Sequence, residues 1–277
     1  MNAFDTRFLK PRIGSEVNLD ASALTAGVFA TELRALLIER GVLVFRDLDI
    51  TLDQQREFTS TLGRLRNSGG GGLQKVTLDA KESPEYAAFF DTTFFWHMDG
   101  PYDQKVPGFA ATLRPARLSS QGGQTEFLNT YAAYDDLTDE EQRFIDGLRV
   151  VHTRLATMSR VMPNATDEEV AAWRKTPAAT QPLVWLHESG RKSLMLGNSV
   201  SHIEGMHPAD SDDVLRRLRS HMTLVQYVYT HEWRMNDLVV WNNTGTMHRA
   251  RPFDPRSGRL LNRFSLEGEE PIRAPGD

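Results

Sequence analysis

The chain has 277 residues, of which 40% are hydrophobic and 25% charged, and it carries a formal net charge of −5 and no cysteine. The absence of cysteine excludes disulfides, thiolate nucleophiles and cysteine-ligated metals, and the negative charge argues against nucleic acid or anionic membrane as a partner. The N-terminus has no signal-peptide pattern and no apolar run approaches the ~18 residues of a membrane span, so we expect a cytoplasmic protein. With no long linker or internal repeat, residues 1–277 are expected to form a single domain.

The first predicted elements are helical. Apolar residues at helical spacing indicate one segment, which Gly41 ends before a short buried strand over residues 42–45. The apolar residues of that segment are Leu24, Val28, Leu33, Leu36 and Leu37. A capping box, Thr51-x-x-Gln54, predicts where the next helix begins. Strands are then expected over residues 109–113 and 124–128.

Further helices are predicted in the second half of the chain. Capping boxes at Thr138 and Thr166 begin two of them, and a third runs from about Ser211. Its apolar face holds Val214, Leu218, Met222 and Val225, whereas Arg216, Arg217 and Arg219 are expected to face solvent. Strands are predicted over residues 148–152, 182–186, 193–196, 238–241 and 260–264. Many short strands that do not alternate regularly with helices favour a mixed α and β fold built on a double-sheet jelly roll.

Two histidines and one aspartate form a candidate metal site. His97-x-Asp99 lies in the middle of the chain and His248 lies 151 residues downstream. This is the ligand set of the facial triad, which holds Fe(II) and leaves positions open for an oxidisable co-substrate and O₂. If His97 and Asp99 are on a strand edge, their side chains project to the same side and those of Trp96 and Met98 face into packing.

Further motifs extend this pattern into a family resemblance. The Gly122-Gly123-Gln124-Thr125 turn and the series Trp241…His248…Arg259…Arg263, taken with the triad, resemble the TauD/TfdA (taurine dioxygenase) family of Fe(II)- and 2-oxoglutarate-dependent oxygenases. The match extends from the helix near Leu24 to about Glu270. It implies a double-stranded β-helix (jelly roll) core with flanking helices, and a homo-oligomer, either a dimer or a tetramer.

The resemblance also implies a role for each residue of the pattern. The iron ligands would be His97, Asp99 and His248. Arg259 would pair with the distal carboxylate of 2-oxoglutarate, helped by the Thr125 hydroxyl. Arg263 would lie near the keto-acid end, where it can also hold an anionic group of the prime substrate.

Elementary chemistry agrees with these roles. 2-Oxoglutarate is a dianion, so a buried carboxylate favours the planar fork of a guanidinium over an ammonium. Arg259 and Arg263, four residues apart on a strand, would point to one face, and Thr125 can donate a hydroxyl bond without adding charge. The competing interpretation is that both arginines form weak ion pairs at a strand end on the surface.

We therefore expect an iron-dependent oxidoreductase that hydroxylates a small organic substrate while 2-oxoglutarate is decarboxylated to succinate and CO₂. Desaturation, cyclisation and ether cleavage are alternatives on the same chemistry. A zinc hydrolase and a non-catalytic jelly-roll binding module are the other classes, although neither requires Thr125, Arg259 and Arg263. The substrate is expected to carry an anionic group near Arg263 and an apolar body near a Phe94–Phe95 strand.

Other residues are weaker candidates. His152, His187, His207, His221 and His231 are interpreted as structural, and so are the aromatic residues Phe95, Trp96 and Trp241. His202 is considered for the pocket, and Asn242, where relatives often carry aspartate, for altered hydrogen bonding behind the ligands. The run Ser68–Gly72 is either a flexible connection or, at Gly69–Gly72, a lid over the iron site. Glycines stand there in place of the polar residues of taurine-using relatives, which argues against taurine itself.

Overall fold

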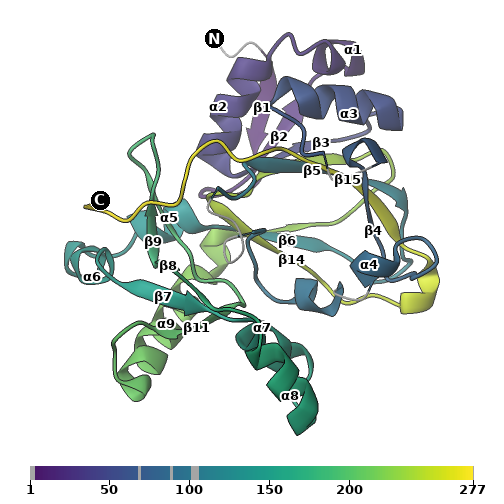
Figure 1. Ribbon diagram of the computed structural model, residues 1–277. Helices are drawn as coiled ribbons and strands as arrows, with labels where there is room; N and C mark the ends of the chain where they lie inside the picture. Colours follow the sequence, from purple (N-terminus) through teal and green to yellow (C-terminus); the bar gives the residue numbers. More distant parts are fainter. Residues whose placement is uncertain (1–3, 68–69, 88–89, 101–105, 277) are drawn as a thin grey trace.

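The computed structural model describes residues 4–67, 70–87, 90–100 and 106–276, and Figure 1 shows two β-sheets that face each other in a mixed α and β structure. Within those ranges, the larger sheet contains β1 (Asp5–Phe8), β2 (Ser15–Asn18), β3 (Val42–Phe45), β13 (Leu238–Asn242), β5 (Ala110–Arg117), β15 (Leu260–Ser265) and β4 (Gln74–Val76), in that spatial order. The smaller sheet contains β12 (Val228–His231), β6 (Thr125–Asn129) and β14 (Thr246–Ala250). The pairing is antiparallel in both sheets except between β2 and β3.

The central strands of the larger sheet are apolar on both faces, because both faces are covered. On β13, Val239 and Trp241 face the smaller sheet and pack with Phe127 of β6, whereas Leu238 and Val240 face the opposite way, towards the helices. Alternate side chains of a strand point to opposite faces, so a strand buried on both sides reads as a continuous apolar run. This explains the unbroken apolar sequences of β3 and β13, which were predicted as strands.

Three N-terminal helices cover the outer face of the larger sheet (Figure 1). They are α1 (Ala21–Thr25), α2 (Ala30–Arg40) and α3 (Leu52–Thr61). The prediction of one helical segment from Leu24 to Gly41 is wrong in one respect, because the helix is interrupted between α1 and α2. Gly27 has φ +67° there, and a Cβ on it would lie 2.8 Å from the Thr61 side chain of α3. Val28, which was expected on the apolar face, is 62% exposed. Gly41 ends α2 as predicted, with φ +75°.

The middle of the chain forms a second layer of helices and short strands around its own apolar core. Its elements are α5 (Thr130–Asp135), α6 (Asp139–Ile145), β7 (Arg149–His152), α7 (Arg154–Val161), α8 (Asp167–Arg174), β8 (Ala179–Pro182), β9 (Val184–Leu186), β10 (Lys192–Leu194), β11 (Val200–Ile203) and α9 (Pro208–Met222). The capping boxes predicted at Thr51, Thr138 and Thr166 are all present. The strand predicted over residues 182–186 is divided between β8 and β9, which belong to different sheets.

Helix α9 differs from its prediction at both ends. It begins at Pro208, and the 3₁₀ turn η3 (Val225–Tyr227) that follows it holds Val225 exposed rather than on the buried face. Arg219 is also not on a solvated face: it is half-buried and donates to the Val200 carbonyl at 3.1 Å. Arg216 and Arg217 are exposed, as expected, and form ion pairs with carboxylates.

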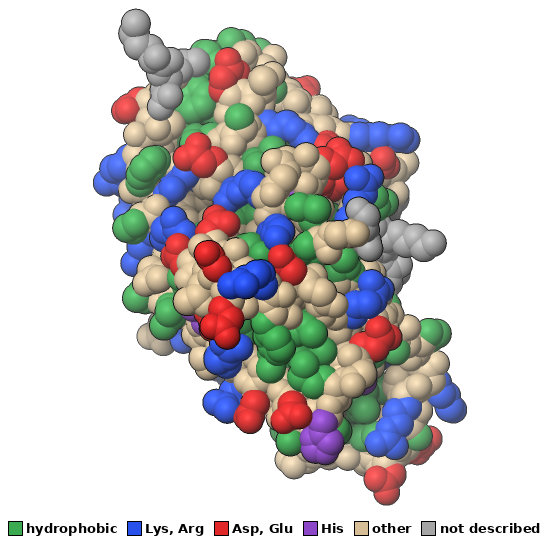
Figure 2. Space-filling model, turned by 90° about the vertical axis from the view of Figure 1, so that its left-hand side faces the viewer, with side chains coloured by type: hydrophobic (Ala, Val, Ile, Leu, Met, Phe, Trp, Pro, Cys, Tyr) green, Lys and Arg blue, Asp and Glu red, His purple; other side chains and the backbone are tan. Residues whose placement is uncertain are grey.

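Two features of the structure concern possible contacts with polyanions and membranes: the distribution of surface charge and the length and apolar character of the helices. On the face shown in Figure 2, basic and acidic side chains are interspersed, so that face has no extended basic patch for a polyanion. In the described ranges, no helix has both the length and the apolar character needed to cross a membrane.

Candidate metal centre

His97 and Asp99 lie in an irregular segment rather than on the strand edge that the sequence predicted. The segment follows the 3₁₀ helix η2 (Phe90–Phe94), so the predicted Phe94–Phe95 strand is wrong as well. A single antiparallel bridge joins His97 to His248 of β14: the His97 N–H donates to the His248 carbonyl at 3.1 Å and the His248 N–H to the His97 carbonyl at 2.9 Å. This bridge brings together two histidines that are far apart in the sequence.

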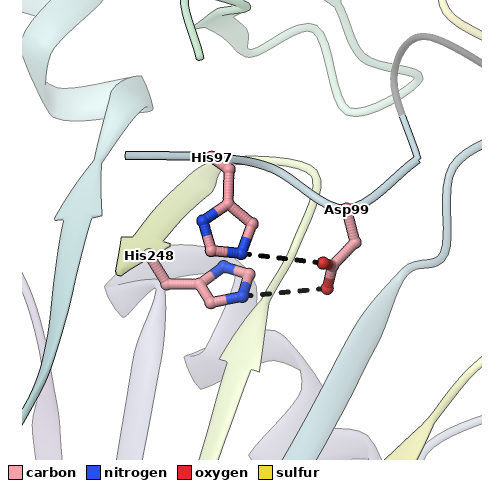
Figure 3. Close-up of side chains that lie close together, drawn as sticks. All are labelled: His97, Asp99 and His248. Atoms are coloured by element: carbon pink, nitrogen blue, oxygen red, sulfur yellow. Dashed lines mark ion pairs between the residues drawn. The ribbon is translucent and has the colours of Figure 1, made fainter. Parts of the chain in front are cut away.

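The three predicted ligands converge. Figure 3 shows the His97 and His248 rings side by side, with Asp99 facing both. Asp99 Oδ1 lies 4.0 Å from His97 Nε2, and Asp99 Oδ2 lies 3.8 Å from His248 Nε2. One donor atom of each residue lies within 4.8 Å of the others, close enough for one ion to contact all three. As predicted, the neighbouring Met98 is buried in the core and Trp96 packs against it.

The protonation states favour a metal. Burial lowers the pKa of His97, and burial together with the adjacent His97 ring lowers that of His248 much further. Burial alone would raise the pKa of the Asp99 carboxyl, but Arg263 and the two imidazoles hold it well below its usual range. His97 Nδ1 lies 2.8 Å from the Phe95 carbonyl and therefore donates to it, which leaves the Nε2 lone pair for a ligand bond. Two neutral imidazoles and one carboxylate are the donor forms that a divalent ion needs, so the residues fit Fe(II).

A cavity between the two sheets lies beside the triad. His97 and His248 line it together with Thr125, Arg259 and Arg263, the residues predicted to bind 2-oxoglutarate. The surface-ion-pair interpretation is thus wrong for both arginines: Arg259 is 2% exposed, and Arg263 contacts the carboxylate of Asp99 and the ring of Trp241. Both line the cavity, although only Arg263 is on β15 and Arg259 stands one residue before that strand.

Arg259 is held by the turn that precedes β6. Its Nη2 donates to the Gly123 carbonyl at 2.8 Å, and its guanidinium lies over the Phe253 ring. Gly123 has φ +78°, and a Cβ on it would lie 2.7 Å from Arg259 Nε, so only glycine permits this close approach. Thr125 begins β6, and its Oγ1 accepts a bond from Trp233 Nε1 at 3.0 Å. That bond leaves the hydroxyl proton available to a second partner.

Several residues of the cavity were not predicted. Its apolar wall consists of Val76, Phe90, Leu113, Trp241, Ala250 and Leu261. Trp241 is only 1% exposed, so it is a packing residue as interpreted, although its ring also borders the cavity. Asn242 contacts Thr244 rather than a ligand, since its Oδ1 accepts from the Thr244 N–H and hydroxyl. Nothing in a single apolar residue distinguishes a cavity wall from a core, which is why the wall could not be found from the sequence.

The histidines interpreted as structural lie outside the cavity. His152, His187 and His231 are buried and paired with Ser199, Glu270 and Asp237 respectively. His202 is exposed on β11 and does not line the cavity. Of the predicted lid, Ser68 and Gly69 lie outside the described residues, and Gly70–Gly72 form the 3₁₀ turn η1.

Comparison with known proteins shows the family of the chain. The family model described as "Taurine catabolism dioxygenase TauD, TfdA family" matches residues 5–265. The chain belongs to the TauD/TfdA family. It is 33% identical to the alpha-ketoglutarate-dependent 2,4-dichlorophenoxyacetate dioxygenase of Cupriavidus pinatubonensis, over 84% of this chain and 86% of that relative. It is 30% identical to the enzyme of the same name from a Burkholderia species, over 96% of this chain and 95% of the other.

A solved structure agrees with this family membership. AAD-2 in complex with Mn(II) and N-oxalylglycine superposes with a TM-score of 0.80 and is 30% identical, over 98% of this chain and 100% of AAD-2. The prediction of a non-haem Fe(II)- and 2-oxoglutarate-dependent dioxygenase, with O₂ as co-substrate, is therefore confirmed.

Proposed function

We propose that this dioxygenase binds Fe(II) through His97, Asp99 and His248 and anchors 2-oxoglutarate with Arg259 and Thr125. The observation that carries the proposal is the shared cavity: His97, His248 and two guanidinium groups line one space between the sheets, and Asp99 lies beside the two histidines. We also infer that the two facing sheets are the double-stranded β-helix of a single domain, since the family match spans residues 5–265. A homo-oligomer and a cytoplasmic location stay predictions, the first of which light scattering tests directly.

Each protein group has a defined task in this mechanism. The Arg259 fork and the Thr125 hydroxyl hold the distal carboxylate of 2-oxoglutarate, so its keto-acid end lies towards His97 and His248. The apolar wall excludes water from the space between co-substrate and substrate. When bound, Fe(II) supplies the redox chemistry that couples decarboxylation of 2-oxoglutarate to insertion of one oxygen atom into a substrate C–H bond.

We further propose that the substrate is a small aryloxyalkanoate. Arg263 is a cation on the metal side of the cavity, where it contacts Asp99, and it can pair with a substrate carboxylate. Phe90, Leu113 and Val76 offer an apolar surface for a ring. The two relatives above are named for such a compound, 2,4-dichlorophenoxyacetate. Hydroxylation of the carbon next to the ether oxygen gives a hemiacetal, which collapses to a phenol and glyoxylate, so ether cleavage follows from the predicted hydroxylation.

A substrate screen tests this proposal. The Fe(II)-loaded enzyme is incubated with 2-oxoglutarate, O₂ and one of 2,4-dichlorophenoxyacetate, phenoxyacetate, an alkyl sulfate or taurine, and succinate and oxidised product are both measured. We expect stoichiometric phenol and succinate from the aryloxyacetates. Faster coupled turnover of the alkyl sulfate or of taurine would contradict the substrate class, and succinate without any oxidised product from the aryloxyacetates would do the same.

A pair of variants tests the role of Arg263. Arg263→Gln removes the cation proposed to pair with the substrate carboxylate and is expected to raise the KM of the aryloxyacetate by about tenfold or more, since a charge-assisted bond contributes ~1.5–3 kcal/mol. Arg251→Gln is the matched control, because Arg251 is exposed and does not line the cavity. Equal KM values for the two variants would contradict the proposal that Arg263 binds the substrate.

A further inference from the structure

The side-chain amide of Asn243 contacts the segment that carries Asp99 on both sides of that residue. Asn243 Oδ1 accepts from the Asp99 N–H at 2.9 Å, and Asn243 Nδ2 donates to the Asp99 carbonyl at 3.1 Å. The same Nδ2 donates to the Gly108 carbonyl at 3.0 Å. Asn243 is 2% exposed, so these bonds form away from bulk water. Both N–H groups and the oxygen of the amide are thereby used.

These bonds give Asp99 the support that a neighbouring strand would give. Asp99 is in an irregular segment, where a regular sheet ladder does not hold the backbone. The amide of Asn243 pairs with the N–H and the C=O of Asp99 together, as the facing residue of an antiparallel strand would. Fixing both groups restricts the backbone on either side of the Asp99 Cα, which sets the direction of the Cα–Cβ bond and of the carboxylate beyond it.

Asn243 is itself held firmly. It lies in the connection between β13 and β14, and its backbone N–H donates to the Phe109 carbonyl at 2.8 Å. His248 follows on β14 and pairs with the backbone of His97. The segment from β13 to β14, which crosses from one sheet to the other, therefore supplies the His248 side chain, the backbone partner of His97 and the side-chain partner of Asp99.

We propose that Asn243 is a positioning residue that fixes the Asp99 carboxylate relative to the two histidines. The inference rests on the proposed role of Asp99 as a metal ligand. Asn243 touches neither the cavity nor the ligand atoms, so its effect passes through the Asp99 backbone. Partners that orient metal ligands typically change metal affinity by 10–100-fold when they are removed. Asn243→Ala is accordingly expected to raise the Kd for a divalent ion by about that factor.

The test uses Mn(II) alone as the probe. Free Mn(II) is measured by electron paramagnetic resonance during titration of the wild-type protein and of two variants. In Asn243→Ala we expect the 10–100-fold loss of Mn(II) affinity. Asn243→Asp keeps an acceptor for the Asp99 N–H but loses both donors and directs an anionic oxygen at two carbonyls, so we expect it not to restore the affinity.

Asn129→Ala is the matched control for a general loss of packing. Asn129 is also a buried asparagine, at the end of β6, but its side chain caps α5 through the Ala132 N–H and donates to the Arg12 carbonyl. It is expected to lose stability with Mn(II) affinity within about twofold of wild type. Wild-type affinity in folded Asn243→Ala, or equal losses in Asn129→Ala and Asn243→Ala, would overturn the inference.

Amide exchange of the unaltered protein covers the case in which Asn243→Ala does not fold. The Asp99 N–H bonds to a buried side chain, so its hydrogen exchange should be at least ~100-fold slower than in an unstructured peptide. Exchange at the unprotected rate would overturn the inference. If the wild-type protein itself fails to bind Mn(II), the proposed metal site fails with it, whereas normal binding by both wild type and Asn243→Ala refutes only the role of Asn243.

Discussion

Replacement of Arg259 by lysine tests the anchor of 2-oxoglutarate most sharply, because it keeps the charge and removes the fork. The Arg259 side chain is almost fully buried, its Nη2 is already bonded to the Gly123 carbonyl, and its guanidinium lies over Phe253. A guanidinium fork can present two parallel N–H bonds to a carboxylate. A lysine ammonium offers a single point charge in the same place, so Arg259→Lys loses one charge-assisted bond.

One such bond contributes ~1.5–3 kcal/mol, which corresponds to a rise of about 10- to 150-fold in the Kd of 2-oxoglutarate. The assay is an anaerobic titration of 2-oxoglutarate into the Fe(II)-loaded protein, followed by visible absorption, which needs no prime substrate. Mn(II) affinity should stay within about twofold, since Arg259 is not one of the three proposed metal ligands. The reasoning would be refuted if Arg259→Lys left the Kd for 2-oxoglutarate unchanged while Arg263→Lys abolished binding. The two arginines would then exchange their proposed roles.

Three further changes have defined outcomes. Thr125→Val should raise the Kd of 2-oxoglutarate about tenfold in the same titration, because one hydroxyl bond to a carboxylate is removed; an unchanged Kd would exclude the hydroxyl from the site. Gly123→Ala should destabilise the protein and weaken 2-oxoglutarate binding, whereas Gly190→Ala, which has a similar φ of +81° but open space around its Cβ, should only destabilise it, by ~1–2 kcal/mol in denaturant unfolding. Burial lowers the pKa of His152 from 6.5 to about 4, so between these values the unfolded chain takes up a proton that the folded chain does not. Stability is therefore lost as the pH falls through this window. Between pH 7 and pH 4.5, the free energy of unfolding measured in urea should fall by about 2–3 kcal/mol less in His152→Gln than in wild type. An equal fall in the two proteins would contradict this account.

The local signals of the sequence predicted those elements whose causes are local. The capping boxes at Thr51, Thr138 and Thr166 each need only four consecutive residues, and all three are present. Gly41 was predicted correctly as the end of α2 because a helix-ending glycine is also a local signal. Gly27 was different, because a side chain there would meet Thr61 of another helix, and helical spacing alone cannot report that contact.

The site was predictable as a set of residues but not as a geometry. The pattern of His97, Asp99 and His248 predicted three candidate donors that the fold brings together, yet the expected strand edge is an irregular segment joined to β14 by one bridge. The contacts that replace the strand come from residues distant in the sequence, above all Asn243, which lies 144 positions from Asp99. Asn243 stands within the Trp241–His248 run that drew attention to the site, but nothing in its residue type indicates what its amide contacts.

Charge patterning was informative only where side chains are exposed. Arg216 and Arg217 pair with surface carboxylates as expected. Arg219 occupies the same helix and the same cluster, but it turns inward to the Val200 carbonyl, and burial lowers its pKa to about 10. The direction of such a side chain is decided by the packing of α9 on β11, which no local pattern contains.

The most direct test of the account is the anaerobic visible spectrum of the metal-free protein as Fe(II) and then 2-oxoglutarate are added. We predict a weak charge-transfer band that requires both additions and is absent from folded His97→Ala. No band in folded, Fe(II)-loaded wild-type protein at saturating 2-oxoglutarate, or the same band in His97→Ala, would contradict the assignment of this cavity as the iron and 2-oxoglutarate site.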